Sequence, residues 1–174
     1  GPDGAGPDGA GPDGAGPDGA GMVRIHFNNR DSADGVSPLS AAKIGARRAE
    51  LGAMFAFLRQ TFPQARRVRG GSWLYNLEAY RRLFPPVYGQ SRRIPEGAVR
   101  YSGTSSWGQM LDFRGAVRPV ARDHMLAHLP DLTLEALWRA FPLRALRASA
   151  PIEAFYDFYG EAGEPAAGQR VSDQ

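Results

Sequence analysis

The sequence predicts an α/β domain with a mixed, partly parallel sheet flanked by helices, arranged as three layers or as a sandwich. Two observations carry this prediction. Apolar and polar residues alternate over residues 23–28, which is the period of a half-buried strand. Apolar residues then recur at intervals of three and four over residues 51–62, which indicates a helix with one buried face. Strands that alternate with helices are typical of βαβ units with parallel neighbours.

The first strand is expected at residues 23–28, directly after Met22, with His26 on its polar side near its end. Its apolar side consists of Val23, Ile25 and Phe27. Because imidazole titrates close to neutrality, His26 is a candidate general base if this polar side lines a cleft. The alternative is a histidine that is simply hydrogen-bonded at the end of a strand.

The first helix is expected to begin at Ser37 and Pro38 and to end at Pro63. A hydroxyl cap followed by proline at the first helical position is typical of a helix N-terminus, and a later proline ends the helix. The face expected to be buried consists of Leu51, Met54, Phe55, Leu58 and Phe62.

The segment from Arg69 to Tyr80 gathers a hydroxyl, an indole, a phenol and an amide. A second strand is expected at residues 65–70, followed by a turn at Gly70 and Gly71 that leads into a helix near Asn76. Glycine tolerates the backbone angles of such a turn and lets a ligand approach the main chain. Ligands on parallel sheets bind at the carboxyl ends of strands, so the turn at 70–76 is the predicted ligand edge.

Two tryptophans and a tyrosine are candidate ligand contacts near this edge. Trp73 and Tyr75 stack on a ligand or close the core over the turn, and at least one of them is expected in the core. A second polar and aromatic turn runs from Ser105 to Gln109 and is a candidate to face the first across a cleft. Its Trp107 is either a ligand contact or a lid on the core.

The rest of the domain is expected to continue the alternation of strands and helices. The helix after Asn76 should end at Pro85. The elements that follow are a strand within residues 91–104, helices at 105–113, 120–129 and 133–141, a strand at 143–149 and a closing helix at 152–159.

Three segments of different composition divide the chain. Residues 1–21 are four copies of Gly-Pro-Asp-Gly-Ala and one Gly, with too little apolar surface to fold, so they are expected to be disordered. Residues 22–160 are expected to form one domain, and residues 161–174 a disordered polar tail.

The chain has no Cys, which excludes disulfides and thiolate chemistry. No apolar stretch approaches the roughly 20 residues that span a bilayer, so a soluble, cytoplasmic protein without membrane partners is expected.

The domain is strongly basic once the repeat is set aside. The 18 acidic residues include the four aspartates of the repeat, so 14 remain against 21 basic residues, a net charge of about +7. All the basic residues except Lys43 are arginines, which suit phosphate or nucleic acid. They are scattered, which favours a compositional bias over a nucleic-acid surface. Only Arg66, Arg67 and Arg69 cluster, directly before the glycines.

The residues from Arg67 to Ser72 partly match the loop with which GNAT-type acyltransferases hold a pyrophosphate. In that loop, successive backbone N–H groups and a helix N-terminus point at the phosphates. The candidate cofactor contacts are Arg67, Arg69, Gly70, Gly71 and Ser72. The alternative is a tight turn between a strand and a helix.

His124 and His128 share a helix face without a neighbouring glutamate of the His-Glu-x-x-His type, so no metal site is expected.

The order of short motifs along the chain resembles a known family. These motifs are Ile25-His26-Phe27, Ser37-Pro38-Leu39, Phe62-Pro63, Ser72-Trp73-Leu74 and Leu83-Phe84-Pro85-Pro86. Over residues 23–115 the chain resembles the carboxyl-terminal GNAT-like domain of a family of largely uncharacterised bacterial acyltransferase-like proteins. The resemblance implies a GNAT-like α/β sandwich and acyl transfer from an acyl-CoA to an amine.

With that activity, His26 or Tyr75 is the proton-transfer candidate, and the enzyme mainly holds thioester and amine together. Trp73, Asn76 and Trp107 are the candidate substrate contacts. Two other functions stay open. One is a non-catalytic module of the same fold that binds a small molecule or a protein, and the other is nucleic-acid binding through the arginines.

Overall fold

The computed structural model describes residues 21–27, 34–95 and 104–160, and the sheet in these ranges has three strands. They are β1 (Met22–Arg24), β2 (Arg67–Ser72) and β3 (Leu146–Pro151), in the order β1-β2-β3. β1 pairs with β2 in parallel, and β2 pairs with β3 in antiparallel fashion. The predicted mixed, partly parallel sheet is thus confirmed. The predicted disordered segments lie outside the described residues, apart from Gly21.

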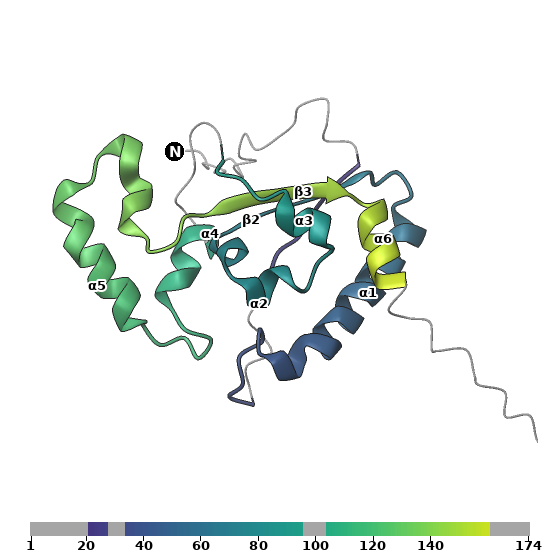
Figure 1. The fold of residues 1–174 in the computed structure, drawn as a ribbon, viewed down its shortest axis with the longest axis horizontal. Helices are drawn as coiled ribbons and strands as arrows, with labels where there is room; N and C mark the ends of the chain where they lie inside the picture. The colour runs from purple at the N-terminus through teal and green to yellow at the C-terminus, as the bar shows by residue number, and fades with distance from the viewer. Residues whose placement is uncertain (1–20, 28–33, 96–103, 161–174) are drawn as a thin grey trace, which may run out of the picture.

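The helices gather mainly on one side of this sheet, below the strands in Figure 1. The α-helices are α1 (Ile44–Thr61), α2 (Glu78–Arg81), α3 (Pro86–Gln90), α4 (Thr104–Trp107), α5 (Pro119–His128) and α6 (Glu153–Gly160). The 3-10 helices are η1 (Ala41–Lys43), η2 (Trp73–Asn76), η3 (Gly108–Met110), η4 (Leu129–Asp131) and η5 (Leu134–Ala140). Figure 1 shows α5 at the opposite end of the molecule from α1 and α6. No helix in the described ranges is long and apolar enough to cross a membrane.

The core lies between the sheet and the helices α1, α2, α3 and α6. Successive side chains of a strand point to opposite faces, so Val68 and Gly70 of β2 face the helices and Arg67 and Arg69 face away. The large buried side chains of the core are Phe55, Val68, Tyr75, Tyr80, Leu83, Phe84, Tyr88, Ile152, Phe155 and Tyr159. Many of these rings meet edge to face, as Tyr80 and Phe84 do at 5.0 Å between ring centroids.

The second strand differs from its prediction at the two glycines. β2 continues through both of them to Ser72, since Gly70 pairs with Ala148 and Gly71 with Arg147 in the ladder with β3. The predicted turn at Gly70 and Gly71 is therefore wrong. The long-range partner strand, which sequence-local reasoning does not see, extends β2 by two residues.

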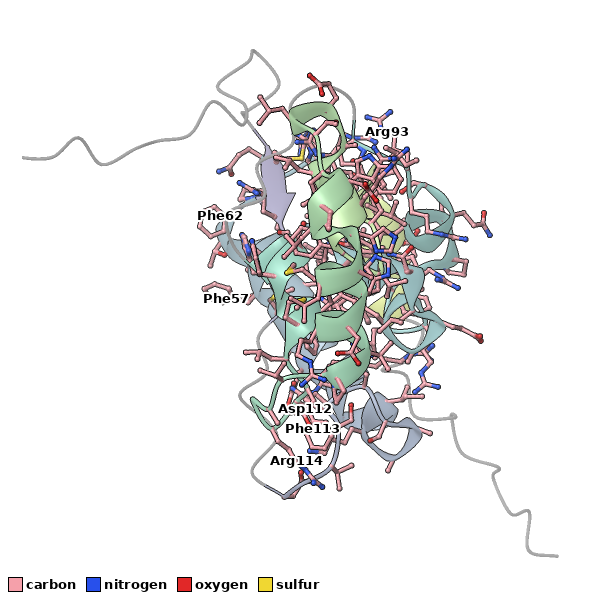
Figure 2. All side chains as sticks on the ribbon, turned by 90° about the vertical axis from the view of Figure 1, so that its left-hand side faces the viewer. Phe57, Phe62, Arg93, Asp112, Phe113 and Arg114 are labelled. Carbon is pink, nitrogen blue, oxygen red and sulfur yellow. The ribbon has the colours of Figure 1, made fainter. Side chains whose placement is uncertain are left out.

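The long first helix also differs from its prediction. The hydroxyl of Ser37 accepts a hydrogen bond from the N–H of Leu39 at 3.3 Å, which closes a local turn instead of capping a helix. A short 3-10 turn then precedes α1, which begins at Ile44. Of the face expected to be buried, Met54 and Phe62 are 39 % and 48 % exposed. Figure 2 shows Phe57 and Phe62 at the periphery, because the short helix α6 covers only one stripe of α1.

The remaining elements are close to their predicted positions, with shifted ends. α3 begins at Pro86, which occupies the first helical position where proline is tolerated. The predicted last strand is β3, shifted by two to three residues, and the segment predicted as a helix at 133–141 is the 3-10 helix η5. Of the strand predicted within 91–104, Arg93 forms an isolated bridge to Arg147. Residues 96–103 lie outside the described ranges.

Candidate functional site

A cleft of about 680 Å³ opens at the carboxyl ends of the parallel strands β1 and β2. We call it the Trp73 cleft. It lies at the sheet edge where parallel strands present ligand sites. Its lining residues are Ile25, His26, Phe27, Ser37, Pro38, Leu39, Gly71, Ser72, Trp73, Leu74, Tyr75, Leu77, Tyr80, Ser105, Gly108, Leu111, Asp112, Phe113 and Arg118.

The end of β2 builds the central wall of this cleft. The hydroxyl of Ser72 accepts a hydrogen bond from the N–H of Leu74 at 3.2 Å and thereby starts the 3-10 helix η2. This cap turns the chain sharply, so that Trp73 is half-buried beside the cleft while Tyr75 enters the core. The prediction that at least one of these two rings belongs to the core is confirmed.

The second polar and aromatic turn packs directly against the end of β2. The hydroxyl of Ser105 donates a hydrogen bond to the carbonyl oxygen of Gly71 at 3.1 Å. Behind it, the buried side-chain amide of Gln109 donates to the carbonyl of Leu143 at 2.9 Å and accepts from its N–H at 2.8 Å. This pair of bonds fixes the wall to the segment that leads into β3.

A loop from Leu111 to Val117 closes a third side of the cleft. Asp112 Oδ1 accepts hydrogen bonds from the N–H groups of Arg114 and Ala116 at 2.8 and 2.9 Å, which folds the loop on itself. Figure 2 shows Asp112 and Arg114 together with Phe113 in this loop at one end of the molecule. Arg118 follows the loop, and its guanidinium lies 6.0 Å from the centroid of the Trp73 ring.

His26 lines the same cleft, beyond the end of β1, and its imidazole is exposed. No hydrogen bond or ion pair within the described ranges fixes this imidazole. The exposed imidazole lies where a ligand in the Trp73 cleft would contact it. His26 is the predicted proton-transfer residue whose position fits contact with a bound molecule.

Tyr75 presents its ring to the cleft but not its hydroxyl. The hydroxyl oxygen lies 2.6 Å from that of Tyr88 inside the core. Burial raises the pKa of the Tyr75 phenol well above its usual value. A phenol that stays protonated cannot accept a proton, so this environment does not favour Tyr75 as a base.

The predicted cofactor residues are divided between two separate concave surfaces. Gly71 and Ser72 line the Trp73 cleft, whereas Arg67 and Arg69 line a separate groove on the face turned away from the helices. Gly70 lies between them, buried against the core. A single loop that presents these five residues to one pyrophosphate is not formed.

Two predicted substrate contacts lie outside the cleft. The side-chain amide of Asn76 donates to the carbonyl oxygens of Trp73 and Arg144, both at 2.8 Å, and so ties η2 to the segment before β3. Trp107 is 47 % exposed and meets the ring of Phe141 edge to face at 5.1 Å. Of the residues named from the sequence, the cleft brings together His26, Gly71, Ser72, Trp73 and Tyr75.

Sequence reasoning missed the third wall of the cleft. Asp112 and Gly115 carry a recognisable turn signal, since an aspartate that binds backbone N–H groups is followed by a glycine with φ +81°. Nothing local points to Arg118, whose place beside Trp73 depends on how the chain returns after the loop. Among the described residues, no group of three or more His, Asp or Glu side chains comes together as a metal site.

Comparison of this chain with protein-family models, with curated proteins and with solved structures found no match.

Proposed function

We propose that the protein binds a small organic ligand with a flat apolar body and an anionic group in the Trp73 cleft. The observation that carries this proposal is the cleft itself. Its volume of about 680 Å³ lies within the range of small-molecule sites, about 300–1,000 Å³. Such sites are mostly apolar and aromatic, with a few polar groups that orient the ligand.

The lining residues supply both kinds of contact. Phe27, Trp73 and Phe113 are aromatic walls, and aromatic side chains offer wide, rigid apolar surfaces to a flat molecule. Arg118 supplies a planar guanidinium whose fork matches a carboxylate or sulfonate. The opposing charge, Asp112, is already held by two backbone N–H groups of its own loop. Because the Asp112 carboxylate is engaged by its own loop, the Arg118 guanidinium favours an anionic group of the ligand beside it.

The test uses 8-anilinonaphthalene-1-sulfonate, an aromatic anion whose fluorescence rises on binding. The wild-type chain is compared with Trp73→Leu, and Trp107→Leu is the matched control because that indole lies outside the cleft. An aromatic contact contributes about 0.5–1.5 kcal/mol, so Trp73→Leu should weaken probe binding about three- to tenfold. Trp107→Leu should leave it unchanged.

Other results with the same variants would contradict the proposal. Equal loss in both variants means that the probe binds elsewhere or reports loosened packing, which the melting temperature of each variant checks. Arg118→Met should also weaken binding of the anionic probe, and its melting temperature shows what the loss of the 3.4 Å hydrogen bond from Arg118 Nη1 to the carbonyl of Gln109 costs in stability. Unchanged binding in both Trp73→Leu and Arg118→Met would remove the proposal.

Acyl transfer from acyl-CoA to an amine, within a GNAT-like fold, is a second candidate. The observation in its favour is that His26, Gly71 and Ser72 line one cleft. An exposed imidazole beside a backbone that can approach a ligand suits removal of a proton from an amine. Calorimetric titration with CoA and acetyl-CoA tests it. The absence of both heat and any change in melting temperature would remove this candidate, and the ligand-binding proposal would stand.

A further inference from the structure

A second concave surface lies on the face of the sheet that points away from the helices. It has a volume of about 750 Å³, and we call it the arginine groove. Its lining residues are Gly21, Met22, Arg66, Arg67, Arg69, Ser91, Arg93, Arg147, Ala148 and Ser149. Five of these ten residues are arginines, and none is acidic or aromatic.

The alternation of the strands explains how the arginines come together. Val68 and Gly70 point into the core, so Arg67 and Arg69 must both point to the opposite face. The neighbouring strand adds to the charge, because Arg24 of β1 is the direct partner of Arg69 in the parallel ladder. On the other side, the bridge between Arg93 and Arg147 brings a further guanidinium to the groove.

Hydrogen bonds hold part of this basic surface in place. Arg67 Nη2 donates to Ser149 Oγ at 3.3 Å. Ser91 Oγ accepts from the N–H of Ser149 at 2.9 Å and donates to the carbonyl of Tyr88 at 2.7 Å. Arg66 Nη1 donates to the carbonyl of Pro63 at 2.7 Å. The groove is therefore a supported surface on regular strands.

Like charges on neighbouring residues of one sheet face repel each other. Arg24 and Arg69 are such a pair, and Arg67 stands two residues away on the same face. An anion in the groove removes this repulsion and gains charge-assisted hydrogen bonds from guanidinium forks. A ligand of opposite charge in the groove is therefore expected to stabilise this face of the sheet.

We propose that the arginine groove binds the oligophosphate group of a small molecule. Phosphate matches the guanidinium fork, and several phosphates in a row match arginines that project from adjacent positions of one face. A single-stranded nucleic acid is less suited, since none of the ten lining residues offers a ring on which a base stacks. The arginine groove shares no lining residue with the Trp73 cleft, and this proposal does not depend on the function proposed for that cleft.

Inorganic tripolyphosphate is the probe, titrated into the full chain by calorimetry, with the melting temperature measured in parallel. Arg69→Gln should weaken binding about tenfold or more, because it removes a charge and a fork from the middle of the groove. Arg69→Lys keeps the charge but loses the fork, so its affinity for tripolyphosphate should lie between those of the wild type and Arg69→Gln. The control is Arg122→Gln, since Arg122 is exposed on α5 and pairs there with Asp123.

The stability of the variants separates a lost site from a lost fold. Without ligand, Arg69→Gln should melt at or above the wild-type temperature, since it relieves the repulsion with Arg24. Tripolyphosphate should raise the melting temperature of the wild type more than that of Arg69→Gln. Trp73→Leu should bind tripolyphosphate as the wild type does, which keeps this proposal distinct from the first.

Three results would overturn the inference. The first is tripolyphosphate binding no tighter than sulfate at equal ionic strength. The second is equal weakening in Arg69→Gln and Arg122→Gln, which indicates screening of the whole basic surface. The third is an oligothymidylate that binds more tightly than tripolyphosphate and loses affinity in Arg69→Gln, which assigns the groove to nucleic acid.

Discussion

The hydroxyl group of Tyr75 occupies the space in front of Gly70, so residue 70 has no room for a side chain. A Cβ at this position would stand 1.9 Å from the Tyr75 hydroxyl oxygen and 2.5 Å from that of Tyr88. The two hydroxyls lie 2.6 Å apart and share a hydrogen bond. The glycine in the middle of β2 is thus explained by a buried pair of tyrosines.

Gly70→Ala is therefore expected to destabilise the fold. The added methyl displaces the Tyr75 hydroxyl and breaks its hydrogen bond with Tyr88, and overpacking of this kind costs about 1–3 kcal/mol. The matched control is Gly71→Ala, because its Cβ would meet nothing nearer than the Cγ of Arg147 at 4.0 Å. Urea denaturation of both variants measures the free energy of unfolding. Similar values for the two would contradict the packing of Tyr75 against Gly70.

The buried tyrosines predict a loss of stability at alkaline pH. Burial raises the pKa of Tyr75, Tyr80, Tyr88 and Tyr159 above the usual value. In the unfolded chain these phenols ionise near about pH 10, while in the folded chain they stay protonated. The stability that they contribute is fully present below about pH 10 and is lost as the pH rises above it, by up to about 1.4 kcal/mol per pH unit for each tyrosine.

Tyr159→Phe isolates one member of this group. The variant loses the hydrogen bond from the Tyr159 hydroxyl to the carbonyl of Leu83, at 2.7 Å, and should be less stable by about 1 kcal/mol near neutral pH. Between about pH 10 and pH 11 its stability should fall less steeply than that of the wild type, because one raised pKa is gone. Denaturation across this pH range measures both slopes, and parallel slopes would speak against the burial of this phenol.

The contact between α1 and α6 predicts a large difference between two phenylalanines of one helix. Phe55 stacks on Phe155 at 4.7 Å and on Tyr159 at 5.4 Å between ring centroids. Phe57, two residues later, is 59 % exposed. Phe55→Ala should cost about 3–5 kcal/mol of stability, and Phe57→Ala should stay within about 0.5 kcal/mol of the wild type. Comparable losses in thermal unfolding would refute this orientation of α1.

The periodic parts of this fold were predictable from the sequence. Local periodicity follows from backbone geometry, so it shows on which side each element is buried. Examples are Val68 between two arginines, and Ile152, Phe155 and Tyr159 at helical spacing. The errors occur where a contact with a residue far away in the sequence determines the end of an element or the exposure of a side chain. β2 continues past Gly70 because β3 pairs with it, and Met54 is exposed because α6 does not reach it.

The candidate sites depend on such distant contacts even more strongly. The sequence places Arg67 to Ser72 together, yet in the fold Arg67 and Arg69 line one groove, while Gly71 and Ser72, at the end of β2, line another cleft. Conversely, Arg118 and Trp73 are 45 positions apart in the sequence, and only folding brings them side by side.

The loop at Asp112 yields a prediction that connects the fold with the proposed ligand site. Asp112→Ala removes the acceptor for the N–H groups of Arg114 and Ala116 and should loosen the wall that carries Phe113. Binding of 8-anilinonaphthalene-1-sulfonate should weaken about threefold or more, since ordering the loop then has to accompany binding. Asp112→Asn keeps a side-chain oxygen as acceptor and should recover most of the affinity, while Asp123→Ala on α5 removes an exposed carboxylate elsewhere and should change nothing. If Asp112→Asn binds as weakly as Asp112→Ala, an amide oxygen does not replace the hydrogen bonds of the carboxylate, and this account of the loop is wrong.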